Sequence, residues 1–280
     1  MKFTPRELRE NVNVSATHPL AEFAWLAGSL LLLCLAALLL LGWGSDYAVA
    51  HLSPRSERWI GAHLPSPFAG APAPPLQQRL DRLLACLPDA SPLRAYHFTV
   101  ELVDTPQVNA IALPGGTIAV FRGLLDKIGS ENELAMVLGH ELGHFAHRDH
   151  LRSLGRGLGV TALSLLVFGP DSSVSNAAGK LFLDFESHYS RKQEASADAF
   201  ALQLLVARYG HAGGALDLFR RFDAEAGSRI PYLVASHPHP ADRIRSIEAL
   251  IAARDYPLAP LTPLGQDLAS EIASDAAAER

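Results

Sequence analysis

The chain has 280 residues, of which 49% are hydrophobic and 19% are charged, and its formal net charge is -5. This length is enough for one globular domain with appendages. The acidic balance, without a stripe of Lys and Arg interleaved with aromatic residues, excludes nucleic acid as a partner. The two cysteines, Cys34 and Cys86, lie far apart, which excludes a disulfide framework and a CxxC metal site.

An apolar segment near the N-terminus predicts a membrane anchor. Residues 23–45 carry no charge, and about 20 apolar residues cross a bilayer as a helix. Trp25 and Trp43 lie near its two ends, where indole rings favour the headgroup region. A buried core helix and a cleaved signal peptide are the alternatives, but the segment is much longer than the apolar region of a signal peptide. We expect an uncleaved single-pass helix over 23–45, after an extramembrane segment over 1–22.

Basic residues flanking this segment slightly favour one orientation. Lys2, Arg6 and Arg9 precede it, whereas Arg55 and Arg58 follow it. Basic residues tend to stay on the cytoplasmic side of a bilayer. We therefore expect a bacterial inner-membrane protein whose larger, C-terminal part lies on the extracytoplasmic side.

A Pro-rich region separates the anchor from the rest of the chain. Residues 46–75 end in the sequence PSPFAGAPAPP, which predicts a semi-rigid extended linker. A globular domain is expected over 76–262. Residues 263–280 are rich in Ala, Ser and acidic residues and are expected to form a loosely ordered tail.

Within the domain, the spacing of apolar residues assigns the secondary structure. Ser130 and Glu133 form a capping-box pattern that opens a long helix, and a Pro-Gly-Gly turn joins two strands into a hairpin. Helices are also expected over 76–87, 181–208 and 240–254, and strands over 97–103, 108–112 and 117–121. The fold class is therefore α+β, mostly helical with a small sheet.

His140, Glu141 and His144 form an HExxH motif inside the expected long helix. Residues four apart lie on one helical face, so both imidazoles can bind one Zn2+ at roughly 2.0–2.1 Å, with Glu141 within reach of a metal-bound water. A chance motif on a solvated helix is the alternative. The residues around the motif are apolar, however, and such a helix is a poor place for His and Glu without a role.

A catalytic zinc site needs a third ligand. His150 stands at the third-ligand position of a metzincin, but His147 replaces the glycine of that pattern and no methionine follows Met136 to form its Met-turn. Glu194 is the better candidate, because small residues around it allow its helix to approach the HExxH helix. Asp198, one turn further on, would then lie beside a ligand imidazole and orient it.

These motifs resemble the membrane-associated gluzincins, a family that includes the HtpX-type and Oma-type quality-control proteases and the CAAX prenyl endopeptidases. The resemblance covers 108–244 in four pieces of matching order: Asn109-Ala110 with its Pro-Gly-Gly turn, 139–147, 189–198, and His237-Pro238 with Arg243-Ile244. It implies a zincin-like fold and a zinc endopeptidase of membrane or misfolded polypeptides. The prenyl enzymes have many membrane spans and this chain shows one, so prenylated substrates are not expected.

We expect a substrate to add to the open edge of strand 108–112, at Asn109 and Ala110, through main-chain hydrogen bonds. The resemblance places His237 and Arg243 beside the metal. There His237 would donate to the oxyanion, and Arg243 would pair with Asp198 or with the developing charge. Alternatively, His237 closes onto the metal as an inhibitory fourth ligand, or both residues are merely exposed.

Two further alternatives remain at this point. The chain could be a catalytically silent, chaperone-like holder of membrane proteins, or its zinc site could be structural. The uncharged segment 157–170 is too short to span a bilayer and is interpreted either as a membrane-dipping helix or as a lid over the cleft between the two ligand helices.

Overall fold

The computed structural model describes residues 18–64, 66, 68–177, 189–225, 237, 240–265 and 268. The predicted N-terminal segment up to residue 17, Pro238 and the tail from residue 269 lie outside the described residues.

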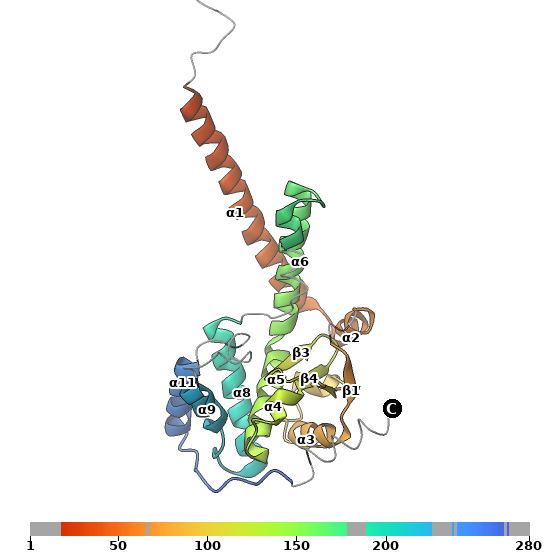
Figure 1. Cartoon of the computed structure of the whole chain (residues 1–280), viewed down its shortest axis with the longest axis vertical. Coiled ribbons are helices and arrows are strands. Elements are labelled where there is room, and N and C mark those ends of the chain that lie inside the picture. Colours follow the sequence, from red (N-terminus) through yellow and green to blue (C-terminus); the bar gives the residue numbers. More distant parts are fainter. Residues whose placement is uncertain are drawn as a thin grey trace, which may run out of the picture.

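The described residues form long helices and one small sheet (Figure 1). The helices are α1 (Pro19–His51), α2 (Pro54–His63), α3 (Pro74–Leu84), η1 (Pro92–Ala95), α4 (Arg122–Leu125), α5 (Glu131–His147), α6 (Asp149–Phe168), α8 (Arg191–Tyr209), α9 (Asp217–Glu225) and α11 (Pro240–Ala253). The strands are β1 (Gly70–Pro72), β2 (Thr99–Val103), β3 (Ala110–Leu113) and β4 (Thr117–Phe121). This confirms the prediction of an α+β fold that is mostly helical.

The four strands form one sheet in the order β1-β2-β4-β3. β2 and β4 are parallel, while β3 and β4 form the predicted antiparallel hairpin, in which Ala110 is opposite Val120. One face of the sheet packs on α3 and α5, where Val100 and Ile118 join the main core. The order leaves β3 at an edge of the sheet, next to α5.

Helices α5 and α8 pack very closely, because small residues face one another along their contact. A Cβ added to Gly143 would lie 2.7 Å from the Cα of Ala197, and one added to Gly139 would lie 3.1 Å from the Cα of Ala201. Two backbones can approach this closely only where one side chain is absent. The contact brings the start of α8 to the HExxH segment of α5.

Helix α1 is longer than the predicted span and extends away from the domain (Figure 1). It has 33 residues, its most apolar window has a mean hydropathy of 2.5, and none of that window is buried. Helix α6 continues from the end of α5 and runs beside α1, not over the site (Figure 1). By length and composition, α6 is a second candidate membrane helix, with a mean hydropathy of 1.3.

One segment differs from its predicted conformation, and another is described only in part. Residues 46–75, expected as an extended linker, contain the end of α1, all of α2, and β1, which pairs with β2. Ser53 accepts from the backbone of Ser56 and so starts α2. Helix α8 begins at Arg191, where Ser190 and Gln193 form a capping box, and the part of this helix predicted over 181–188 lies outside the described residues.

Candidate metal centre

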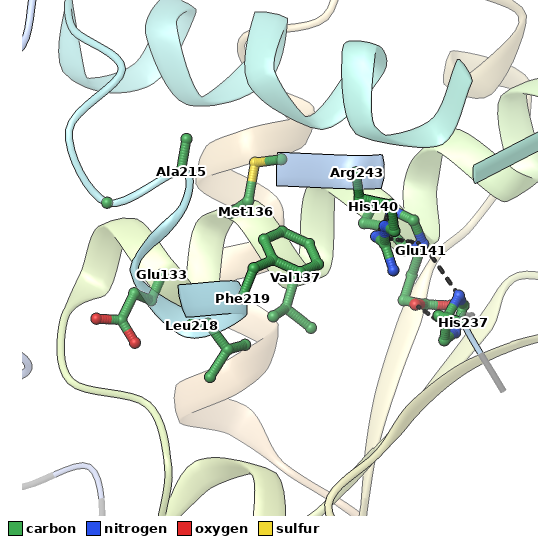
Figure 2. Close-up of a pocket in the computed structure, with 11 residues that line it drawn as sticks. Glu133, Met136, Val137, His140, Glu141, Ala215, Leu218, Phe219, His237 and Arg243 are labelled. Atoms are coloured by element: carbon green, nitrogen blue, oxygen red, sulfur yellow. Dashed lines mark hydrogen bonds and ion pairs between the residues drawn. The ribbon is translucent and has the colours of Figure 1, made fainter. Parts of the chain in front are cut away.

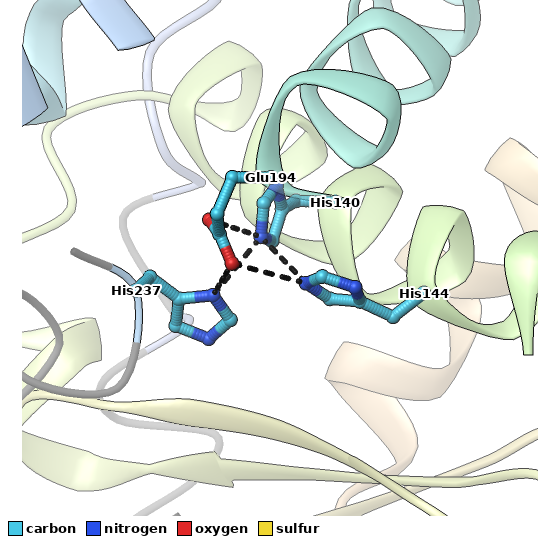
Figure 3. Close-up of side chains that lie close together, drawn as sticks. All are labelled: His140, His144, Glu194 and His237. Carbon is cyan, nitrogen blue, oxygen red and sulfur yellow. Dashed lines mark hydrogen bonds and ion pairs between the residues drawn. The ribbon is translucent and has the colours of Figure 1, made fainter. Parts of the chain in front are cut away.

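Three helical residues and one residue outside the helices bring four side chains together (Figure 3). His140 and His144 come from α5, Glu194 from the first turn of α8, and His237 from just before α11. One ligand atom from each lies within 4.8 Å of the others, and all four residues are buried. The structure thus brings together the three predicted metal ligands and His237.

The spacing of these atoms suits a tetrahedral metal ion. The Nε2 atoms of His140 and His144 are 3.0 Å apart, and Nδ1 of His237 is 3.2 Å from Nε2 of His140. Oxygens of Glu194 lie 3.5 Å and 3.7 Å from the two Nε2 atoms. Ligands bound to Zn2+ at roughly 2.0–2.1 Å in a tetrahedron are about 3.3 Å apart, so the four atoms fit such an ion.

The two ligand imidazoles are protonated at the same ring nitrogen. Nδ1 of His140 faces Asp198 at 2.9 Å, and Nδ1 of His144 faces Asp149 at 3.1 Å. A carboxylate only accepts hydrogen bonds, so each ring carries its proton on Nδ1. The lone pairs on both Nε2 atoms then converge on one point, which is the arrangement that a cation stabilises.

The groups around His140 are charged side chains. Arg243 forms two hydrogen bonds with Asp198, of 2.9 Å and 2.6 Å, and lies 3.0 Å from Glu194. Although burial alone would raise the pKa of Asp198, the charge of Arg243 lowers it to about 2. Burial would also raise the pKa of Glu194, but His237 and Arg243 hold it well below its ordinary value. Both carboxyls are therefore ionised at neutral pH.

On the His144 side, the partners are a carboxylate, an amide and a phenol ring. Asp149, the first residue of α6, accepts from Gln193 at 2.8 Å as well as from His144. Tyr189 stacks on the imidazole, with ring centroids 3.8 Å apart. Burial lowers the pKa of His144 to about 3, so this ring is neutral and available as a ligand at pH 7.

Asp149 and Gln193 are not among the residues predicted from the sequence to form the site. A usable signal was present, because a ligand imidazole needs an acceptor at its second nitrogen and Asp149 follows His144 by five residues, just beyond the end of its helix. No pattern in the sequence predicts the contact of Gln193 with Asp149. Its role depends on the position of α8 relative to α6, which no local pattern encodes.

Glu141 lies beside the cluster without belonging to it. Its Oε1 is 3.9 Å from Nε2 of His237, and its Oε2 has no hydrogen-bond partner among the described residues. Burial raises the pKa of its carboxyl above the ordinary value, although His237 and His140 oppose that shift and the backbone N–H of Ala112 donates to it. Glu141 therefore lies beside the candidate centre, where its carboxylate can accept a proton.

A pocket with an apolar wall opens next to Glu141 and His140 (Figure 2). Its apolar wall consists of residues from α5, from the segment before α9 and from α9 itself: Met136, Val137, Ala215, Leu218 and Phe219. The polar end of the pocket is formed by the candidate centre.

The other predicted residues fall into two groups. His147 and His150 lie away from the centre: His147 bonds the carbonyl of Gly143 at 2.7 Å, and His150 pairs with Glu57 at 2.7 Å, which agrees with the rejection of a metzincin site. Asn109 and Ala110 lie at the start of the edge strand β3, and both are fully buried.

Comparison with known proteins identifies the family. A family model described as Peptidase family M48 matches residues 72–251. The mitochondrial metalloendopeptidase OMA1 of Danio rerio is 32% identical over 179 residues, which cover 58% of this chain and 37% of that protein. The metalloprotease YcaL of Escherichia coli K12 is 30% identical over 154 residues, covering 53% and 60%. The putative beta-barrel assembly-enhancing protease of Vibrio cholerae is 30% identical over 179 residues, covering 59% and 37%.

The chain spans less than two thirds of the length of each of these relatives. The matched region nevertheless contains the whole candidate centre and more than half of this chain. It confirms the predicted resemblance to Oma-type membrane-associated metalloproteases. With its candidate metal ligands inside the matched region, the chain belongs to peptidase family M48.

Proposed function

We propose that this chain is a membrane-anchored, zinc-dependent endopeptidase that hydrolyses peptide bonds of membrane or misfolded proteins. The observation that carries the proposal is the convergence of His140, His144 and Glu194, with Glu141 beside them and outside the ligand set. Two imidazoles and a carboxylate are a usual ligand set of catalytic zinc sites. A structural zinc site is disfavoured because such sites usually include cysteine, which this cluster lacks, and because a candidate general base, Glu141, lies beside the cluster.

The metal ion and the residues of the chain supply different parts of the proposed hydrolysis. A Zn2+ ion held by the three ligands supplies Lewis-acid activation of water and of the peptide carbonyl. Glu141 takes the proton from the attacking water and delivers it to the leaving amine. Its raised pKa supports this role, because a general base works best when its pKa approaches the operating pH.

The substrate is proposed to lie along β3 as an added strand. β3 is at the edge of the sheet, and the N–H of its Ala112 already contacts Glu141, so a peptide paired with β3 passes the base. Main-chain pairing is insensitive to sequence, and the neighbouring pocket favours one apolar side chain. Both features suit unfolded or membrane polypeptides. The printed name of the Vibrio cholerae relative, which refers to assembly of beta-barrels, supports membrane proteins as substrates.

His237 and Arg243 are proposed to complete the site. Arg243 neutralises Asp198 and Glu194, and so holds the side of the centre that carries His140. His237 donates to the oxyanion of the scissile carbonyl. Its Nδ1 lies 3.0 Å from Oε1 of Glu194, which also suits an inhibitory fourth ligand, and the two roles predict opposite effects of removing the ring.

Membrane attachment is proposed through α1, with α6 dipping into the same leaflet. A Cβ added to Gly159 of α6 would lie 3.5 Å from the Cβ of Leu41 of α1, so the two apolar surfaces lie at one level. Phe168 is nine residues further along α6, about 14 Å at 1.5 Å per residue, which is about half of a hydrocarbon core of roughly 30 Å. Ser172 and Ser175 both donate to the carbonyl of Gly169, the C-cap of α6, and satisfy that carbonyl without water.

Hydrolysis of casein by the full-length protein in detergent tests the activity. We expect turnover that a zinc chelator abolishes, and a loss of at least about 100-fold in Glu141→Gln with one metal per chain retained, the scale of a lost general base. Glu248→Gln, on the exposed face of α11, is the matched control and keeps full turnover. Suppression of aggregation without hydrolysis in the wild type would favour the chaperone-like holder.

The native cysteines test the orientation. We expect a membrane-impermeant maleimide to label Cys86 in intact spheroplasts, because Cys86 lies on the domain, and to leave Cys34 unlabelled within α1. Labelling of Cys86 only after lysis would place the domain in the cytoplasm. In a Cys86→Ser background, Leu166→Cys should stay unlabelled in intact membranes, whereas Arg156→Cys at the start of α6 should be labelled.

A further inference from the structure

We propose that Arg148 and Asp149 form a positioning link through which the seating of helix α1 against the domain sets the metal affinity of His144. The inference rests on the proposed metal centre and adds a route by which the membrane anchor acts on it. Neither residue touches the reacting atoms, and both act through His144.

Arg148 joins the end of α1 to the end of the HExxH helix. Its Nη1 donates to the carbonyls of Val49 and Leu52, both at 2.6 Å. Leu52 is the C-cap of α1, and the last carbonyls of a helix have no partner inside that helix. A guanidinium at this end also complements the negative pole of the helix dipole. One side chain therefore supplies donors and charge to the end of α1.

The backbone at Arg148 has an unusual conformation for this residue type. Its φ is 57° and its ψ is 32°, the left-handed region that glycine adopts most easily. The residue separates α5 from α6 and serves as the C-cap of the first and the N-cap of the second. A cap alone needs only glycine here. The arginine side chain is thus accounted for by its contacts with α1, not by the turn.

Asp149 carries the link to the metal ligand. It follows Arg148 directly and is 1% exposed, with Oδ2 on Nδ1 of His144 and Oδ1 on Gln193. A carboxylate at the second nitrogen of a ligand imidazole holds the ring in place and raises its basicity. When Arg148 moves with the end of α1, the adjacent Asp149 moves relative to His144.

A second buried contact stiffens the same junction. Glu57 of α2 is fully buried and accepts from His150 at 2.7 Å and from Tyr96 at 2.5 Å. Helix α2 follows α1 after a short break, and Figure 1 shows α1, α2 and α6 meeting where α5 ends. The end of α1 is therefore held against α6 and cannot shift without moving the turn at Arg148.

The test measures Zn2+ affinity of the full-length protein in detergent, by titration against a chelator of known affinity. We expect Asp149→Ala to raise the Kd for Zn2+ about 10- to 100-fold, the usual effect of losing a carboxylate behind a ligand histidine. Arg148→Gly keeps the left-handed turn and removes the side chain, and we expect it to raise the Kd about 10-fold at an unchanged melting temperature. Arg156→Ala, an exposed arginine on α6, is the control and keeps the wild-type Kd.

The double variant Arg148→Gly with Asp149→Ala shows whether the two residues act in one chain of contacts. If Arg148 acts through Asp149, the double variant has the Kd of Asp149→Ala alone. Multiplied effects, or a wild-type Kd in Arg148→Gly, would overturn the link. Arg148→Asn, which also tolerates the left-handed conformation, replaces the glycine variant if that one does not fold, and failure of both would assign Arg148 to folding alone. A wild-type protein that binds no Zn2+ would refute the proposed function instead.

Discussion

The two ligand histidines of α5 have the same chemistry and are held in different ways. His140 is oriented by Asp198, which α8 supplies and Arg243 of α11 neutralises. His144 is oriented by Asp149, which follows it in the chain and bonds a neutral amide. The first side depends on ionic contacts between distant segments, whereas the second depends on a local turn at the base of the membrane helix. Disturbing each side should therefore damage different properties of the protein.

The largest effect is expected from loss of Glu194, the third ligand, which lies near both His140 and His144. Glu194→Ala should lower Zn2+ occupancy, because it removes the only carboxylate ligand of the described cluster. His150→Ala should still bind one ion per chain, since His150 pairs with Glu57 and not with the centre. Metal analysis after gel filtration compares the two variants. A requirement for His150 but not Glu194 would restore the metzincin interpretation.

Removing His237 separates its two proposed roles. If the ring donates to the oxyanion, His237→Ala should lower casein turnover by about 100- to 1,000-fold, the scale of one lost donor, with metal content unchanged. If the ring is an inhibitory fourth ligand, turnover should rise. If His237→Ala has the turnover, metal content and melting temperature of the wild type, His237 does not belong to the site.

Stability should distinguish the two sides directly. Arg243→Ala leaves Asp198 and Glu194 buried without their cation, and the free energy of unfolding should fall by about 3–5 kcal/mol. Asp149→Ala removes hydrogen bonds from His144 and Gln193, and the expected loss is smaller, about 1–3 kcal/mol. Denaturant titration of metal-free protein measures both. Equal losses would contradict the distinction between an ionic and a local side.

The smallest effect concerns pH at the membrane junction. Burial alone would raise the pKa of Glu57, but His150 and Tyr96 lower it below its ordinary value of 4.5. Because the folded state binds this proton less readily than the unfolded state does, the ionised carboxylate stabilises the fold above about pH 4.5, and this contribution is lost as pH falls further. The stability difference between wild type and Glu57→Gln should therefore be largest near pH 7 and narrow below about pH 4.5. A difference that grows on acidification would contradict this assignment.

Local patterns in the sequence predicted the parts of the site that follow helical spacing. His140 and His144 are four residues apart, so they share a face in any helix, and the apolar residues around them require a core helix. Asp198 follows Glu194 by the same spacing and proved to contact His140. The hairpin could also be predicted from the sequence, because its turn needs residues such as Gly115 and Gly116. Their φ angles of 99° and 108° are ones that other residues rarely adopt.

Only the tertiary structure decided which surfaces meet. The sequence determined the HExxH helix, the apolar N-terminal helix and the metallopeptidase family, since each depends on spacing or composition within a short segment. It did not reveal that the supposed linker contains α2, whose Glu57 pairs with His150 across 93 positions of chain, or that Arg148 bonds carbonyls of α1. Contacts between distant segments depend on how whole helices pack, and no pattern within one segment encodes that packing.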